Sequence, residues 1–273
     1  MRTWALAVFL VALFTGAGDR HLLAQNERVT AVLAATRAAL GGEDRIKGVR
    51  TFVATGRTRQ LRGDNLVPIE FEMQAELPDR YSRHEEVPAQ DTPPTTLGFD
   101  GDALIQIPPA AAPAARRGGP GPPQPALTPQ ERVNGLKQDF ARLMLGMFAV
   151  GPAGVTLTFT DGGEAESPQG KAHVINVAGL GATPTRLFLD AQTNLPLMVS
   201  WQAAPAGARE AAPPLETAAV EQRLFFADYR TVDGLRLPFR IRRAVAADTV
   251  EETTFDRFRI NVKIDPRRFG PRN

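Results

Sequence analysis

The stretch LFFADYRTVDGLRLPFRIRR, residues 224–243, carries the clearest structural signal in the chain. Its second half alternates strictly between two faces, with Leu235, Leu237, Phe239 and Ile241 on one and Arg236, Pro238, Arg240 and Arg242 on the other. Asp233-Gly234, directly before it, is a dipeptide typical of a two-residue hairpin turn. The stretch therefore predicts an antiparallel hairpin with one buried face and one wetted face.

The same period-2 pattern recurs along the rest of the chain. In residues 66–77, Ile69, Phe71 and Met73 alternate with glutamates, and in residues 155–160, Leu157 and Phe159 alternate with threonines. Asp161-Gly162-Gly163 would then turn the chain, and Gly56 suggests a bulge. The further strands that we expect lie at 50–62, 80–86, 103–107, 171–179, 185–190, 195–202, 218–229, 235–245 and 250–264.

Two segments have helical spacing instead. Residues 26–40 repeat apolar side chains every three or four positions, and Gly41-Gly42 ends the segment. Residues 128–148 open on Thr128-Pro129-Gln130-Glu131, a capping box, and carry a broad apolar stripe. We interpret this stripe as packed core in preference to a mobile lid. Many strands with two helices predict an α+β domain built on one large, curved antiparallel sheet.

At 273 residues the chain is long enough for one large domain, which we place at residues 26–273. Residues 108–127 are rich in Pro, Ala and Gly and cannot bury enough apolar surface to form a core. We interpret this segment, and a second Pro/Ala-rich segment at 203–214, as surface loops within the domain.

Residues 1–25 are predicted to be a signal peptide. Arg2 precedes an apolar run at 4–14 that is short for a membrane span, and cleavage is expected after Ala17 or Ala24. An uncleaved anchor is the alternative. The expected product is an exported periplasmic protein without a transmembrane span. Because the chain has no cysteine, we expect neither disulfides nor a lipoprotein anchor.

The order of these elements and of several short motifs resembles the bacterial outer-membrane lipoprotein-sorting proteins, the LolA/LolB-like group. The motifs are Leu40-Gly41-Gly42, Pro78-Asp79-Arg80-Tyr81, Phe99-Asp100-Gly101, residues 189–196, residues 228–234, Leu237-Pro238-Phe239 and residues 260–269. The resemblance covers nearly the whole chain after the signal peptide. It implies a half-barrel, an incomplete β-barrel whose concave apolar face is covered by helices. In the carriers of this group, which serve outer-membrane biogenesis, the concavity holds lipoprotein acyl chains.

The leading hypothesis is therefore a non-enzymatic carrier that binds a lipid acyl chain or a lipoprotein in the concavity. The candidate cavity residues are the large apolar side chains of the one-sided strands: Ile69, Phe71, Met73, Leu157, Phe159, Leu237, Phe239 and Ile241. The alternative is an envelope scaffold with a self-filled core, which would dock a protein partner through the arginine face of the hairpin or through the Pro-rich loops.

The sequence lacks the residue patterns that are typical of enzymes, metal sites and cofactor sites. After export only His84 and His173 remain, not at metal-ligand spacing, and no nucleophile elbow, phosphate loop or dinucleotide fingerprint occurs. We therefore expect no catalytic residues, no metal and no cofactor. A hydrolase using paired carboxylates such as Glu70 and Glu72 is the least favoured alternative. A net charge of +2 argues against nucleic acid, and the two helices argue against an outer-membrane barrel.

Overall fold

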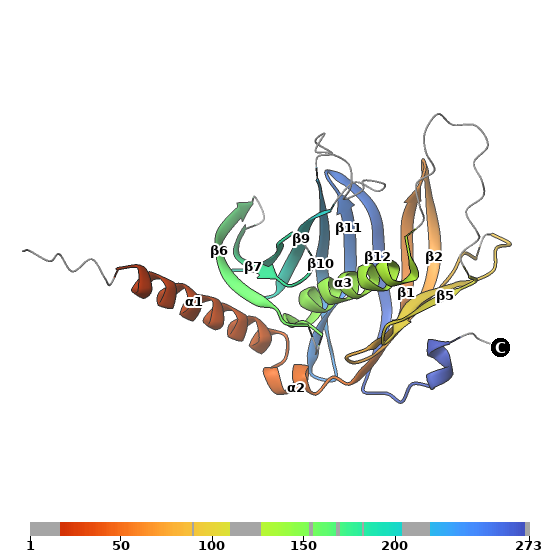
Figure 1. Ribbon diagram of the computed structural model, residues 1–273, viewed down its shortest axis with the longest axis horizontal. Coiled ribbons are helices and arrows are strands. Elements are labelled where there is room, and N and C mark those ends of the chain that lie inside the picture. Colours follow the sequence, from red (N-terminus) through yellow and green to blue (C-terminus); the bar gives the residue numbers. More distant parts are fainter. Residues whose placement is uncertain are drawn as a thin grey trace, which may run out of the picture.

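The computed structural model describes residues 17–88, 90–109, 127–152, 155–167, 170–181, 183–203 and 219–270, with side chains from Gln25 onward. Its main feature is one curved antiparallel sheet with the helix α3 (Pro129–Phe148) lying in its hollow (Figure 1). The sheet is open, because its two edge strands do not pair with each other. We call the face that packs against α3 the inner face and the opposite one the outer face.

Twelve strands make up the sheet in the described part of the chain. They are β1 (Thr51–Arg62), β2 (Asn65–Glu76), β3 (Arg80–Glu86), β4 (Thr95–Asp100), β5 (Ala103–Ile107), β6 (Thr158–Ser167), β7 (Gly170–Ala178), β8 (Thr185–Asp190), β9 (Pro196–Ala203), β10 (Val220–Val232), β11 (Leu235–Val245) and β12 (Asp248–Ile260). The helices are α1 (Ala17–Ala39), α2 (Glu43–Lys47) and α3, with a short 3-10 helix η1 (Pro266–Phe269) after the last strand.

The strands pair in the order β5-β4-β3-β2-β1-β12-β11-β10-β9-β8-β7-β6. Strands that follow each other in sequence are therefore neighbours everywhere except across α3. This helix connects β5, at one edge of the sheet, with β6, at the other edge. The strands from β6 to β12 then follow one another back toward the middle of the sheet, where β12 pairs with β1. The expected α+β architecture with one large curved antiparallel sheet is confirmed.

The hairpin of residues 224–243 forms as its sequence predicts. Val232 faces Leu235 across a two-residue turn in which Asp233 and Gly234 have φ of 50° and 80°. The end of α1 packs against this turn, because a Cβ on Gly41 would come within 2.2 Å of the Gly234 carbonyl oxygen. The Arg236 amide donates to the Leu40 carbonyl at 2.8 Å. The Gly41-Gly42 helix stop and the Asp-Gly turn thus meet in space.

Helix α3 begins at the predicted capping box. The Glu131 amide donates to the Thr128 hydroxyl at 3.2 Å, and the Thr128 amide donates to the Glu131 carboxylate at 2.7 Å. On the inner face, the Phe140 ring lies 6.5 Å from the Phe52 ring and 4.7 Å from the Tyr81 ring, centroid to centroid. The apolar stripe of α3 is therefore core, with each large buried side chain contributing about 1.5–3 kcal/mol.

Helix α1 packs against the edge strand β6. Val29 and Leu33 are buried in the main core, and Arg28 forms ion pairs with Glu164 at 2.9 Å and with Asp161 at 3.6 Å. The apolar spacing predicted for residues 26–40 faces the core, and the charged pairs lie at its rim. Since edge strands expose unpaired backbone groups, this helix also covers part of one sheet edge.

The turn predicted at Asp161-Gly162-Gly163 is wrong. β6 runs through these residues and keeps pairing with β7, and the register shifts between Asp161 and Glu164 as at a bulge. Gly163 takes up the irregularity with φ of 82°. Val155 and Leu157 precede the strand, which begins at Thr158. A Gly-Gly pair marks a bulge as well as a turn, and only the continued pairing with β7 distinguishes the two.

One part of the outer face is covered, although the sequence predicted it to be wet. Gln74 is 1% exposed, and its amide donates to the Ser82 hydroxyl at 2.9 Å and to the Arg268 carbonyl at 3.0 Å. The reason is that the chain leaves the sheet at Ile260, short of the predicted 264, and folds back. A small second core then joins this segment to β1 and β5 through Val53, Ile105, Ile264 and Phe269.

Several predictions fall outside the described residues. These are residues 1–16 of the signal peptide, most of the loop at 108–127 and most of the second loop at 203–214. Helix α1 begins at Ala17, inside the predicted signal peptide, so the peptide and its cleavage site stay predictions. Within the described part, no helix combines the length and hydropathy that crossing a membrane requires.

Candidate ligand-binding pocket

A row of apolar side chains crosses four neighbouring strands on the outer face. Val174 on β7 faces Phe188 on β8, Phe188 faces Met198 on β9, and Met198 faces Phe225 on β10. The row continues to Arg242 on β11, the cross-strand partner of Phe225. Facing residues in an antiparallel pair point to the same side of the sheet. We call these five residues the outer row.

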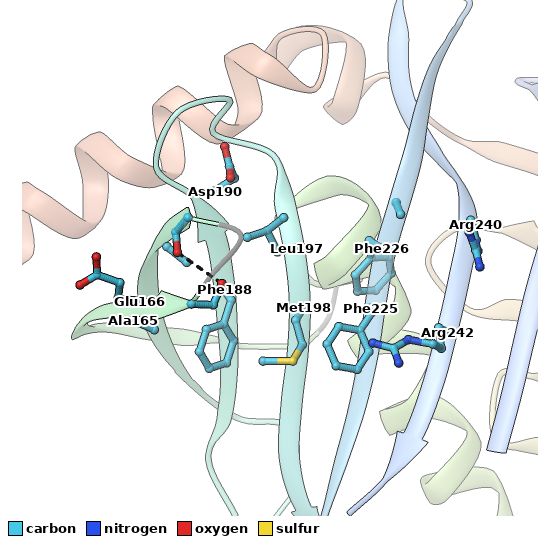
Figure 2. Close-up of a pocket in the computed structure, with 14 residues that line it drawn as sticks. Ala165, Glu166, Phe188, Asp190, Leu197, Met198, Phe225, Phe226, Arg240 and Arg242 are labelled. Carbon is cyan, nitrogen blue, oxygen red and sulfur yellow. Dashed lines mark hydrogen bonds between the residues drawn. The ribbon is translucent and has the colours of Figure 1, made fainter. Parts of the chain in front are cut away.

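The strands carrying the outer row are apolar on the inner face too. Leu187, Val199, Phe226 and Ile241, which alternate with the outer row, are between 0% and 7% exposed and belong to the main core. The Phe226 ring touches α3 at Gly146. Strand faces alternate from one residue to the next, so the outer row points away from α3. Figure 2 shows Phe188, Met198 and Phe225 side by side, with Arg242 beside Phe225.

Phe188, Met198, Phe225 and Arg242 of the outer row line a pocket with a volume of about 530 Å³. Its walls are completed by the β6–β7 hairpin near Ala165 and Ala172, by Leu197 on β9 and by Ala227 on β10. This volume falls within the range of roughly 300–1,000 Å³ typical of small-molecule sites. Two pockets beside α3, of about 240 Å³ and 180 Å³, fall below it. The pocket is therefore the strongest candidate site.

A local irregularity in β9 adds a second apolar side chain to this wall. Phe188 faces Met198 and Leu189 faces Pro196, so β9 has one extra residue at Leu197. Such a bulge lets two consecutive side chains lie on one side of a strand. Leu197 and Met198 accordingly both line the pocket, and Leu197 is 39% exposed.

Two arginines of β11 stand at one end of the pocket. The Arg240 guanidinium forms an ion pair with the carboxylate of Glu252 on β12. The Arg242 guanidinium carbon lies 4.0 Å from the centroid of the Phe225 ring, and one of its NH groups donates to the Thr249 hydroxyl at 3.2 Å. Phe225 thus holds Arg242 against the apolar wall.

Two carboxylates lie toward the β6–β8 side of the pocket. Asp190 accepts hydrogen bonds from its own turn, from the Thr193 amide at 2.6 Å and hydroxyl at 2.7 Å. Burial acts to raise the pKa of Asp190, but the hydrogen bonds from Thr193 and Gln192 outweigh it, and the pKa lies below its ordinary value. Glu166 lies 3.9 Å from Lys171. Both carboxylates are therefore engaged within their own hairpins.

The eight side chains predicted to line a cavity lie elsewhere. Ile69, Phe71, Met73, Leu237, Phe239 and Ile241 are at most 7% exposed, and Leu157 and Phe159 are partly buried against the main core. None of them lines the large pocket, and Phe71 alone touches a second outer-face pocket, of about 310 Å³. Leu237 and Ile241 face the interior, so a ligand would reach them only if the inner core opened. Their assignment to a ligand site stays a prediction.

The sequence prediction missed Phe188, Leu197, Met198 and Phe225. A signal for them exists in the runs Leu187-Phe188-Leu189, Leu197-Met198-Val199 and Leu224-Phe225-Phe226, which have three consecutive apolar residues. Such runs are typical of strands covered on both faces. The clean alternation of residues 235–241 is instead typical of a strand with a single apolar face.

The residues considered for catalysis have structural partners. Glu72 pairs with Arg268 at 2.6 Å, Glu76 with Arg80 at 3.3 Å, and Glu70 lies 3.8 Å from Arg57. His84 shares a hydrogen bond with the Thr96 hydroxyl at 2.9 Å, and His173 lies 3.8 Å from Glu164. Among the described residues, no three His, Asp or Glu side chains are grouped as metal ligands would be.

Comparison with known proteins supports the architecture. No protein family and no curated protein matches the sequence. A LolA superfamily protein from Nitrosomonas europaea matches the structure with a TM-score of 0.52 at 10% identity, over 89% of this chain and 97% of that one. A DUF1329 family protein from Desulfovibrio piger (TM-score 0.48, 9% identity, 88% and 96% of the two chains) is also similar. So is an outer membrane lipoprotein-sorting protein domain from Vibrio parahaemolyticus (0.46, 10%, 89% and 96%).

Similarity at this level of identity concerns the fold. The resemblance inferred from the sequence motifs is confirmed in that sense. The chain has the LolA-like fold, an open, curved antiparallel sheet with a helix across its hollow.

Proposed function

We propose that the protein is a non-enzymatic carrier or binding protein of the cell envelope that holds a lipid acyl chain, free or attached to a lipoprotein. The observation that carries this proposal is the pocket of about 530 Å³ walled by Phe188, Leu197, Met198 and Phe225. An acyl chain suits such a wall because each buried methylene contributes roughly 0.8 kcal/mol without needing a polar partner. The LolA-like fold and the predicted export to the periplasm are consistent with it.

The proposal places the ligand on the outer face and not in the concavity. The inner face is filled by the side chains of the protein itself, such as Phe52, Phe140 and Leu237. The outer face is covered near η1 by the returning chain, where Phe269 fills the second core. Phe188, Met198 and Phe225 of the outer row, together with Leu197, form an apolar part of this face that borders a pocket.

The first test is direct. Protein purified from a periplasmic fraction is analysed by native mass spectrometry, and displacement of a fluorescent fatty acid is measured. We expect either a lipid that co-purifies with the protein or a saturable displacement of the fluorescent fatty acid. Absence of both would contradict the proposal.

A pair of variants then locates the site. Leu197→Asp puts a charge in the apolar wall, whereas Leu66→Asp puts one on β2, where Leu66 is 65% exposed and outside the pocket. We expect Leu197→Asp to weaken fatty-acid binding at least tenfold, on the order of 1.4 kcal/mol, because a charge is costly beside a buried chain. Leu66→Asp should bind as the wild type does. Equal affinity of both variants would place the ligand elsewhere.

The second candidate is an envelope scaffold that carries no lipid. The self-filled inner face favours it, since the two pockets beside α3 in the described part of the chain have volumes of only about 240 Å³ and 180 Å³. In that case, purified protein would contain no lipid and would bind no fatty acid, and cross-linking in cells would recover an envelope protein.

A further inference from the structure

The charges around the pocket are unevenly compensated. Asp190 and Glu166 are engaged within their own hairpins, and Arg240 is paired with Glu252. Within the part of the chain that the structure describes, Arg242 forms no ion pair with a carboxylate. One positive charge at the pocket therefore lacks a counter-charge.

The register explains why Arg242 has no carboxylate. Its cross-strand partner on β12 is Glu252, but the Glu252 carboxylate is taken by Arg240, which lies two residues away on the same face of β11. Arg242 instead turns toward the Phe225 ring, with Thr249 accepting one of its hydrogen bonds. A guanidinium carries five N–H donors, so most of them stay available for a ligand.

We infer that the pocket binds an anionic single-chain amphiphile, with its tail along Phe188, Met198 and Phe225 and its carboxylate or phosphate head on the Arg242 guanidinium. This inference rests on the proposed function and adds the chemistry of the head group. The planar fork of arginine matches both anions with two parallel hydrogen bonds. The outer-row residues that line the pocket then orient the ligand: Phe188, Met198 and Phe225 take the tail, and Arg242 takes the head.

A series of ligands with one tail and different heads tests the inference. Dodecanoate, dodecyl phosphate, dodecyl maltoside and dodecyltrimethylammonium are titrated below micelle formation by calorimetry. Acetate and inorganic phosphate serve as heads without a tail. We expect the two anionic amphiphiles to bind about tenfold more tightly than the maltoside, as a charge-assisted hydrogen bond provides. The cationic amphiphile should bind least tightly, and the heads alone should not bind measurably.

Variants of the arginine isolate its role. Arg242→Gln should weaken dodecanoate and dodecyl phosphate about tenfold and leave dodecyl maltoside unchanged, and Arg242→Lys should keep part of the preference for anions. The matched control is Arg259→Gln, an exposed arginine of β12 that does not line the pocket, and its affinities should equal those of the wild type. Thermal unfolding of each variant verifies that the fold is intact.

The possible failures can be told apart. If no dodecyl compound binds, the proposed function itself is wrong. If all of them bind with equal affinity, or if Arg242→Gln leaves the preference for anions unchanged, an acyl chain is held but the head-group inference is wrong. If inorganic phosphate alone binds to Arg242 as tightly as dodecyl phosphate, the site is an anion site without a tail pocket, which also overturns it.

Discussion

The ring of Phe226 on β10 lies directly on the backbone of Gly146 in α3. A Cβ placed on residue 146 would come 2.0 Å from the Phe226 Cζ atom. The absence of a side chain at Gly146 leaves the room that the Phe226 ring occupies. The contact also seals the inner side of β10, while the preceding residue, Phe225, points outward into the pocket.

The contact predicts opposite effects for two glycines of one helix. Gly146→Ala should lower the free energy of unfolding by up to about 2 kcal/mol, since overpacking costs roughly 1–3 kcal/mol and the gain in helix propensity offsets about 1 kcal/mol of this. Gly135→Ala, where nothing lies within 4 Å of the new Cβ, should raise it by about 0.5–1 kcal/mol. Urea unfolding measures both. A stabilised Gly146→Ala variant would contradict the close packing of α3.

The two faces of the sheet should respond differently to truncation. Leu237 is fully buried on the inner face, and Leu237→Ala should cost about 2–5 kcal/mol of stability. Leu197 is 39% exposed in the pocket, and Leu197→Ala should cost less than about 1 kcal/mol while weakening fatty-acid binding. Thermal unfolding and fatty-acid titration are measured on both variants. If Leu237→Ala kept its stability and lost binding, the inner face would be the ligand site.

Both tyrosines of the chain should resist ionisation while the protein is folded. Burial raises the pKa of Tyr81 to about 12, and burial also raises the pKa of Tyr229, whose hydroxyl donates to the Pro196 carbonyl at 2.8 Å. In the unfolded chain both pKa values return to about 10. The tyrosinate absorbance of the native protein should therefore stay low at pH 10 and rise in a single step on unfolding.

The same shift sets a pH dependence of stability. Because the folded pKa of Tyr81 lies above the unfolded one, its contribution is complete below pH of about 10 and is lost as the pH rises toward 12. Part of the side chain still reaches the surface, so we expect a loss below the roughly 3 kcal/mol that two pKa units represent. Urea unfolding of wild type and Tyr81→Phe across this range measures it, and equal slopes would refute the assignment.

The contribution of the α3 capping box to stability can be tested by conservative substitutions of Thr128. Thr128→Ala removes the hydroxyl that accepts from the Glu131 amide and should cost about 1 kcal/mol. Thr128→Ser keeps a hydroxyl in place and should cost only a few tenths of the roughly 1 kcal/mol lost in Thr128→Ala. Chemical denaturation distinguishes them, and equal losses in both variants would mean that the threonine methyl, and not the cap, carries the effect.

The architecture could be predicted because its signals are local. Alternation at 235–241 predicted β11, Asp233-Gly234 predicted its turn, and the capping box predicted where α3 begins. Predictions failed where distant segments decide the outcome. Gly162-Gly163 became a bulge because β7 continues beside it, and Gln74 became buried because the chain after Ile260 folds back over it.

The sequence by itself determined which residues share a face of each strand, because side-chain direction follows from the backbone period alone. It therefore placed Leu237 with Ile241, and Arg240 with Arg242. Only the tertiary structure decided which face is filled and which is hollow. α3 fills the inner face with side chains from far along the chain, and the Leu197 bulge and the β6–β7 hairpin shape the pocket beside Phe225. Alternation carries no information about what covers a face, since that depends on how distant segments pack.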